Sequence, residues 1–197
     1  RQDLDIISAS SGDNTIAWYE NDGAANPSWT AADISTTADG ARNVFVADID
    51  SDGDLDIVSA SHDDDTIAWY ENDGNSDPSF TKNVISTSAD GARGVHIADI
   101  DSDGDLDIVS ASRIDNKIAW YENDGAANPS WSTTTIATSA AGARDIHIAD
   151  MDNDGDLDIV SASSGDDTIA WYENDGAANP SWLSLIHISE PTRPSII

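Results

Sequence analysis

The chain has 197 residues, with 38 Asp and Glu against only 8 Lys and Arg, which gives a formal net charge of −30 at pH 7. Nucleic acid and anionic membrane surfaces bind through clustered positive charge, so this composition makes both poor partners. The chain has no cysteine, which excludes disulfides and thiol redox chemistry, and no stretch is long and apolar enough to insert into a membrane.

One hexapeptide, Trp-Tyr-Glu-Asn-Asp-Gly, repeats at a constant spacing along the chain. It begins at Trp18, Trp69, Trp120 and Trp171, 51 residues apart each time. A fixed period of this size indicates one supersecondary unit repeated in tandem. Strongly acidic chains can be disordered, but aromatic and β-branched residues at the same places in each copy favour a packed core.

The opening residues 1–42 contain an incomplete copy of the unit. The first strand and most of the acidic loop seen in later copies are missing, and only Asp3 and Asp5 correspond to acids of that loop. We therefore expect a partial unit here, without enough ligands for a metal ion.

The second copy, residues 43–93, shows the complete unit. Alternating and β-branched runs predict four strands, at 43–48, 55–61, 66–71 and 80–86. An acidic loop, a polar turn and a Pro-containing loop separate them, and no segment has a helical period. The copies at 94–144 and 145–182 repeat this order.

Four short antiparallel strands in about 50 residues are the size of one β-propeller blade. Trp69 and Tyr70 are adjacent, so they point to opposite faces of a sheet, and blades stacked face to face would bury both. We predict an all-β fold, an arc of about four blades over residues 1–182, with a β-sandwich or a β-solenoid as the alternatives. Such an arc is expected to be part of a larger ring, with the remaining blades supplied by a longer parent chain, although four-bladed rings exist.

The repeat pattern ends after Trp182. Residues 183–197 depart from it, with His187 at the position that Ile34, Ile85 and Ile136 hold in earlier copies. This stretch resembles translated sequencing-adapter read-through, so we interpret residues 183–197 as a non-native tail. A divergent closing strand is the alternative.

Each complete copy carries an acidic loop with an aspartate at every second position, first at residues 48–56. The side chains of the first, second, third and fifth aspartates can converge on one ion, while Gly53 permits a sharp turn and the Asp54 carbonyl can add an oxygen. Hard oxygen ligands from a flexible loop suit Ca²⁺ better than Mg²⁺. An EF-hand is excluded, because its twelfth position would be Glu and is Ser59 here, and because the flanks are strands.

At these residues the chain resembles a known family. The loop Asp-x-Asp-x-Asp-Gly-x-x-Asp between two strands is similar to that of the FG-GAP/VCBS repeats of integrin-α-like propellers. The strand Ile-Ala-Trp-Tyr-Glu-Asn-Asp-Gly and the lead-in Ala-Asp-Gly-Ala-Arg are similar to the bacterial members. The resemblance covers residues 1–182 and implies calcium in the loop that joins the inner strand of a blade to its second strand.

The resemblance implies five ligands in each of the three intact loops. They are Asp48, Asp50, Asp52, Asp54 and Asp56; Asp99, Asp101, Asp103, Asp105 and Asp107; and Asp150, Asp152, Asp154, Asp156 and Asp158. The alternative is an acidic turn without metal, which would leave carboxylates repelling one another at close range.

One arginine recurs in the lead-in of each complete copy, at Arg42, Arg93 and Arg144. If the strand order of the family holds, these residues lie on the face opposite the calcium loops, beside the variable turns between the second and third strands. Variable loops on a rigid scaffold are common binding positions, so we predict that the three arginines contact a ligand. The competing interpretation is that they form salt bridges between blades.

The remaining aromatic and histidine residues are expected to be structural. We expect the repeated tryptophans to lie in the core between blades, and Trp29, Trp131, Trp182 and Phe80, which begin the outer strands, to be buried as well. His96 and His147 stand where the second copy has Phe45, which indicates packing near the central channel.

The sequence contains no catalytic constellation, with no nucleophile elbow, histidine-rich metal site or phosphate loop. We therefore expect a non-enzymatic, calcium-stabilised domain that mediates adhesion or binds an extracellular protein or glycan. Because calcium fills weak sites outside the cell and not in the cytosol, a secreted or cell-surface protein is expected. The alternatives are an accessory domain of a secreted polysaccharide-active enzyme and a structural spacer in a large surface protein.

Overall fold

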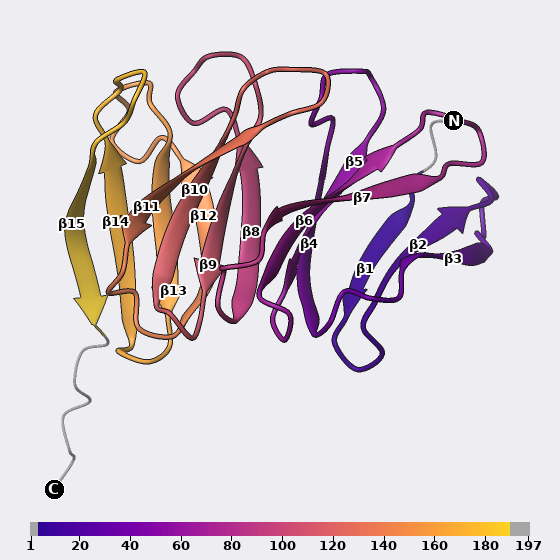
Figure 1. Ribbon diagram of the computed structural model, residues 1–197, viewed down its shortest axis with the longest axis horizontal. Helices are drawn as coiled ribbons and strands as arrows, with labels where there is room; N and C mark the ends of the chain where they lie inside the picture. Colours follow the sequence, from indigo (N-terminus) through magenta and orange to yellow (C-terminus); the bar gives the residue numbers. More distant parts are fainter. Residues whose placement is uncertain (1–3, 190–197) are drawn as a thin grey trace, which may run out of the picture.

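A computed structural model describes residues 4–189, with side chains described through Ser184, and within that range it contains fifteen strands and no helix (Figure 1). The described residues therefore contain no helix that could cross a membrane. The strands form one three-stranded and three four-stranded sheets, each built from consecutive antiparallel strands. The predicted all-β fold is confirmed.

The first two sheets hold seven strands. These are β1 (Ile6–Ser10), β2 (Thr15–Asn21) and β3 (Trp29–Ser35) in the first sheet, and β4 (Ala41–Ala47), β5 (Asp56–Ser61), β6 (Thr66–Asn72) and β7 (Phe80–Ser86) in the second.

The last two sheets have four strands each. These are β8 (Ala92–Ala98), β9 (Asp107–Ser112), β10 (Lys117–Asn123) and β11 (Trp131–Ala137), then β12 (Ala143–Ala149), β13 (Asp158–Ser163), β14 (Thr168–Asn174) and β15 (Trp182–Ser189). The register is the same in each copy: Val58 pairs with Trp69 in the second sheet as Val109 pairs with Trp120 in the third.

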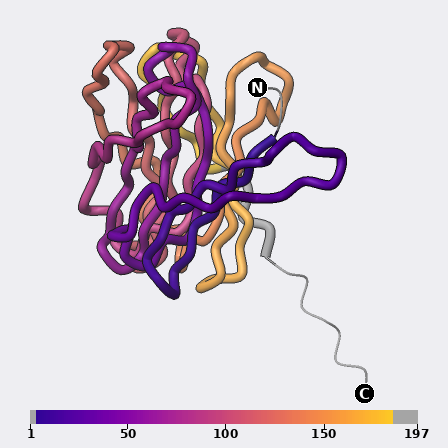
Figure 2. Tube along the Cα trace, turned by 90° about the vertical axis from the view of Figure 1, so that its right-hand side faces the viewer, coloured from indigo at the N-terminus to yellow at the C-terminus, as the bar shows by residue number. Residues whose placement is uncertain are grey.

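The sheets stand side by side (Figure 1), and the inner strands β4, β8 and β12 are neighbours. Figure 2 shows the curvature: the middle sheets lie to the left, and the first and last sheets swing to the right. The arc of propeller-like blades is as predicted.

The core lies between sheets, and the two middle sheets are buried on both faces. Trp69 and Tyr70 are each 1% exposed. Trp69 packs in one cluster with Tyr121 of the third sheet, while Tyr70 packs in another with Ile16 of the first sheet. Adjacent residues of one strand therefore serve two different cores, because successive side chains point to opposite faces.

The two ends of the arc expose apolar side chains that are buried in the middle. Ile169 of β14 is 42% exposed, whereas Ile118 at the same position of β10 is fully buried. At the other end, Trp29 is 43% exposed and lies beside Ile6 and Tyr19. The expected burial of Trp29 is therefore wrong, because in the described residues no sheet covers that face.

The backbone of β15 takes the outer-strand position of the fourth sheet. It pairs with β14 from Trp182 onward, but its bulge falls beside Trp171 and Tyr172, whereas the other sheets place theirs beside the preceding Ile-Ala pair, as at Ile118 and Ala119. The interpretation of residues 183–197 as a non-native tail stays a prediction, and residues 190–197 lie outside the described residues.

We expect the same substitution to cost different amounts at two places in the repeat. Trp120→Ala removes a side chain enclosed between two sheets and should lower the free energy of unfolding by about 3–5 kcal/mol. Trp171→Ala, at the open end of the arc, should cost about 2 kcal/mol or less. Chemical denaturation of both variants checks this, and equal losses would contradict the assignment of the core to the spaces between sheets.

Candidate metal centres

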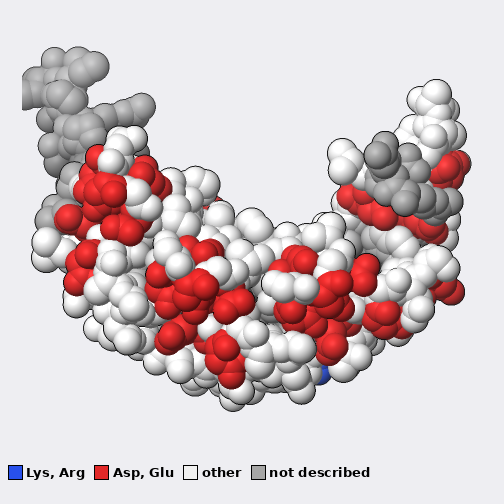
Figure 3. All heavy atoms as spheres, turned by 90° about the horizontal axis from the view of Figure 1, so that it is seen from above, with Lys and Arg blue, Asp and Glu red and all other residues white. Residues whose placement is uncertain are grey.

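The acidic loops join each inner strand to the second strand of its sheet, at residues 48–55, 99–106 and 150–157. Seen from above, Asp and Glu gather in separate patches along the arc, and Lys and Arg are nearly absent from this face (Figure 3). All three loops lie at the same edge because the inner strands run in the same direction.

Each loop is shaped by its own carboxylates. In the first, the Gly53 amide donates to Asp48 Oδ2 at 3.1 Å, and the Asp54 amide donates to Asp52 Oδ1 at 2.9 Å. Gly53 has a φ of +100°, in the region that favours glycine. The second and third loops repeat both hydrogen bonds.

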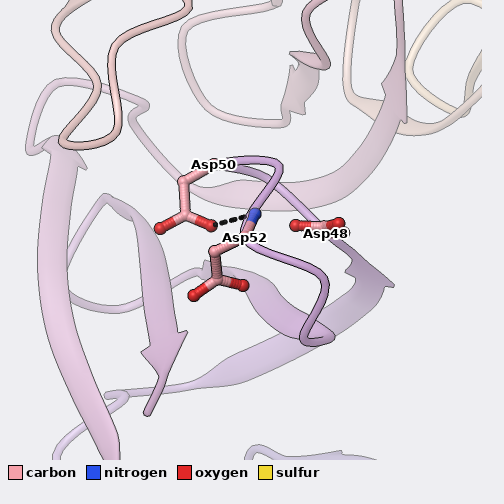
Figure 4. Close-up of side chains that lie close together, drawn as sticks. All are labelled: Asp48, Asp50 and Asp52. Atoms are coloured by element: carbon pink, nitrogen blue, oxygen red, sulfur yellow. Dashed lines mark hydrogen bonds between the residues drawn. The ribbon is translucent and has the colours of Figure 1, made fainter. Parts of the chain in front are cut away.

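Three of the five predicted ligands converge in every loop. Asp48, Asp50 and Asp52 each place a carboxylate oxygen within 4.8 Å of the others (Figure 4). The corresponding sets are Asp99, Asp101 and Asp103, and Asp150, Asp152 and Asp154. These clusters could hold a metal ion, and an all-carboxylate donor set fits a hard divalent cation.

Partial burial and neighbouring carboxylates raise the pKa of the second aspartate. At Asp50 the causes are burial first, then the charge of Asp52, followed by those of Glu71 and Asp48. At Asp101 they are burial, Asp103, Glu122 and Asp99. Glu71 and Glu122 belong to the repeated hexapeptide, and nothing in the sequence shows that they lie near the acidic loops.

The first two loops contain a buried carboxylate oxygen that accepts no hydrogen bond. Asp48 Oδ1 and Asp99 Oδ1 are both in this state within the described residues, and each lies beside two further carboxylates. Buried polar atoms normally have a partner, so a cation fits both positions.

The third loop differs from the other two. Asp150 Oδ1 accepts a hydrogen bond from the Asn153 amide at 2.7 Å, and all three carboxylates of its cluster are exposed. The residue after the first aspartate is Met151, 48% exposed, where Ile100 is 1% exposed in the second loop.

The first two loops are tied to the next sheet by an asparagine. Asn123 Nδ2 donates to the Ile49 carbonyl at 3.2 Å, and Asn174 Nδ2 donates to the Ile100 carbonyl at 3.0 Å. Each bond joins residues 74 apart in the chain. These asparagines belong to the repeated hexapeptide, but their role across the sheets could not be foreseen from it.

The fifth aspartate of each loop serves the backbone. Asp56 is 1% exposed and accepts from the Asn72 amide at 2.8 Å and the Ile49 amide at 3.1 Å. Asp5 of the incomplete first copy accepts equivalently from the Asn21 amide at 2.8 Å, although Asp3 lies outside the described residues. Since this role exists without a complete loop, a ligand role for Asp56, Asp107 and Asp158 stays a prediction.

The side chain of the fourth aspartate lies against a glycine of the loop between the third and fourth strands. A Cβ at Gly74 would collide with the Asp54 carboxylate, and the same holds for Gly125 with Asp105 and for Gly176 with Asp156. A ligand role for Asp54, Asp105 and Asp156 therefore rests on the predicted backbone carbonyl.

The three predicted arginines line one pocket of about 280 Å³, together with Asn43 and Asp145. They stand at the start of the inner strands, at the end opposite the acidic loops. Among the described residues the ion pairs are His62–Asp63 and Lys117–Asp115. The three arginines therefore form no salt bridges between blades in this part of the chain, contrary to the alternative interpretation.

His96 and His147 pack along the inner strands, as expected. The His96 ring lies 4.7 Å from the ring of Phe45 and 5.4 Å from that of His147. Burial, followed by the charge of His147, lowers the pKa of His96, which favours the neutral ring and agrees with a packing role.

The stability of the metal-free protein should fall as the pH rises from about 5 to about 8. Burial raises the pKa of Asp56 to about 6 and that of Asp107 to about 7. The folded state therefore binds protons more tightly than the unfolded state above pH 4, and this advantage is lost as these groups ionise. Denaturation in chelator across this range measures the slope.

Asp107→Asn should flatten that pH dependence, whereas Asp124→Asn should not, because hydrogen bonds lower the pKa of Asp124 and keep its titration below the range. A metal-free protein whose stability rises between pH 5 and 8 would contradict the effect of burial on these carboxyls.

Comparison with known proteins agrees with this geometry. The family model described as FG-GAP-like repeat matches four overlapping segments, residues 2–59, 48–110, 99–161 and 150–196. No individually curated protein matches the chain by sequence.

Solved structures that share the fold include an enzyme and a lectin. The periplasmic gluconolactonase PpgL of Pseudomonas aeruginosa is 13% identical with a TM-score of 0.65, and the match covers 94% of this chain and 51% of that one. An Agrocybe aegerita lectin with specific recognition of non-reducing terminal N-acetylglucosamine is 14% identical with a TM-score of 0.57, covering 93% and 52%. The chain thus spans about half the length of both structures.

Proposed function

The chain belongs to the FG-GAP-like repeat family, and from that membership we propose that it is a calcium-stabilised, non-catalytic propeller domain. Its parent is a secreted or cell-surface bacterial protein, and its role is adhesion or the binding of an extracellular protein or glycan. The calcium ions are structural: they neutralise the loops and hold neighbouring blades together.

The observation that carries the calcium proposal is the buried, unpartnered oxygen of Asp48 and of Asp99. Each oxygen lies in a cluster of three carboxylates, and among the described residues no Lys or Arg forms an ion pair with these clusters. Calcium accepts six to eight oxygen ligands in flexible geometry, whereas magnesium demands a near-ideal octahedron. A loop that offers carboxylates, carbonyls and access to water suits calcium.

The same loops explain why an ion would stabilise more than one blade. The Ile49 carbonyl accepts from Asn123 of the next sheet, and Ile49 itself lies in the core shared by the second and third sheets. An ordered loop therefore positions both a hydrogen bond and an apolar contact across the joint.

The proposed location follows from affinity. Sites built from a flexible loop in extracellular modules bind calcium weakly, in the range of about 10⁻⁴–10⁻³ M. Such sites fill outside the cell, where calcium is abundant, and stay empty in the cytosol.

We propose that further blades from the parent chain close the ring. The end sheets expose apolar residues whose counterparts are buried in the middle of the arc, as with Ile169 and Met151, and an exposed apolar face of this kind favours a partner. The two structures that share the fold are about twice as long as this chain, which supports the same proposal.

A second candidate function is an accessory domain of a secreted polysaccharide-active enzyme. One structure with this fold is an enzyme and the other a lectin, but identities of 13% and 14% support the fold alone. A structural spacer is the third candidate. A glycan-binding screen separates adhesion from a spacer, and a catalytic module beside this domain in the parent chain would favour the accessory role.

Calcium titration by calorimetry on the whole chain tests the proposal, with up to three sites expected. Asp101→Ala should remove one site, and at calcium one hundred times the dissociation constant the loss should cost about 2.7 kcal/mol of stability. Asp33→Ala, which removes an exposed acid of β3, is the control for charge. An unchanged stoichiometry in Asp101→Ala would refute the assigned loop.

The third loop should bind calcium more weakly than the second. Its carboxylates are exposed, its first aspartate already accepts two amide hydrogen bonds, and in the described residues no asparagine from a following sheet holds it. Asp152→Ala should therefore lower the melting temperature in calcium by less than Asp101→Ala does. An equal or larger effect would show that the contact between sheets is irrelevant to binding.

A further inference from the structure

The positive charge of this acidic chain is concentrated at one place in the described structure. Of 8 Lys and Arg in the whole sequence, three arginines line the pocket described above. Arg93 is half-buried there, and burial, followed by the charges of Arg144, Arg42 and Arg113, lowers its pKa. Like charges held this close repel one another, so the arrangement is unfavourable unless an anion joins it.

The backbone directs all three side chains in the same way. Each arginine is the extra residue of a β-bulge at the start of an inner strand: Arg42 between Ala41 and Asn43, with Arg93 and Arg144 at the equivalent steps. Bulges re-aim a side chain and are common beside functional sites. The pocket is therefore built by three identical backbone irregularities, one from each complete blade.

The bulges of adjacent strands also lie close together. A Cβ at Gly94 would stand 3.2 Å from the Arg144 carbonyl, so the glycine after Arg93 permits the tight approach of β8 to β12. About 20 Å of extended strand separates the arginine from the acidic loop of the same blade, which keeps the guanidinium groups away from the calcium ligands.

The guanidinium groups keep their hydrogen-bonding capacity. Among the described residues none of them takes part in an ion pair, and no side-chain hydrogen bond involves them. One carboxylate, that of Asp145, lines the pocket, and its Oδ1 accepts from the Ile146 amide at 3.0 Å. The lining side chains thus carry three positive charges and one negative charge.

We propose that Arg42, Arg93 and Arg144 bind a sulfate-type ligand with two negative charges. The ligand is either the free sulfate ion or a sugar that carries two sulfate esters. Guanidinium groups pair with oxyanions through two parallel hydrogen bonds. Three of them around one pocket match a tetrahedral group, whose oxygens point in several directions, better than a planar carboxylate. This inference deepens the proposed ligand-binding function and rests on it.

Calorimetry on the folded, calcium-loaded protein at constant ionic strength tests the site with inorganic sulfate. Arg93→Gln should weaken binding about tenfold or more. Arg93→Lys should weaken it less, because lysine keeps the positive charge but lacks the paired donors of the guanidinium group. Lys82→Gln, which removes an exposed cation of β7, is the matched control and should bind like the wild type. A disulfated disaccharide and its unsulfated parent distinguish the sources: tighter binding of the sulfated sugar than of sulfate indicates an ester ligand, and the reverse indicates the free ion.

Two outcomes would overturn the arginine site: no sulfate binding by the wild type, or equal affinity in Arg93→Gln and Lys82→Gln. Calcium titration and near-UV circular dichroism of the same sample keep the proposals separate. A folded protein that binds calcium but not sulfate refutes the arginine site alone. A protein that binds sulfate through Arg93 but takes up no calcium refutes the calcium proposal and supports the site.

Discussion

The rest of the structure depends on one constraint: each sheet is apolar on both faces and needs a neighbour on each side to bury them. Each repeated strand places Trp toward one neighbour and Tyr toward the other, so that Trp69 and Tyr121 share one core and Trp120 and Tyr172 share the next. A sheet taken alone would expose both faces. Stability is therefore a property of pairs of blades, and the apolar residues at the two ends of the arc follow from the same pattern.

The acidic loops belong to these joints between blades as much as to their own sheets. Ile49 and Ile100 insert into the cores between sheets. The side-chain amide of the next blade's asparagine donates to their carbonyls and also to a carbonyl of its own blade. The fifth aspartate anchors the loop to the third strand of the same blade. Neutralising the first three carboxylates would thus stabilise an element that two blades share. The third loop, at the open end of the arc, keeps the anchor of its fifth aspartate but has no contact from a following blade within the described residues.

The common direction of the inner strands gives the arc two chemically different edges. Every inner strand starts with an arginine at a bulge and ends at an acidic loop. The repeat therefore places the arginines along one edge of the arc and the acidic loops along the other. The acidic edge collects the carboxylates seen in Figure 3, and the other edge brings three arginines into one pocket. Two binding chemistries of opposite charge can therefore occupy one domain without cancelling each other.

Local and periodic features could be predicted from the sequence alone: the 51-residue repeat, the strand positions within one or two residues, the turn at Gly53 and the alternation of the aspartates. These follow from backbone preference and spacing within one unit. The folded chain was needed to show which aspartates converge, that Asp56 serves the backbone, that Asn123 reaches the loop of another blade, that Trp29 is exposed and that the arginines gather without forming ion pairs. The convergence of the aspartates and the hydrogen bonds of Asp56 depend on side-chain placement within one blade. The other three features depend on where a neighbouring sheet lies, and contacts between residues more than fifty positions apart leave no mark in the pattern of a single repeat.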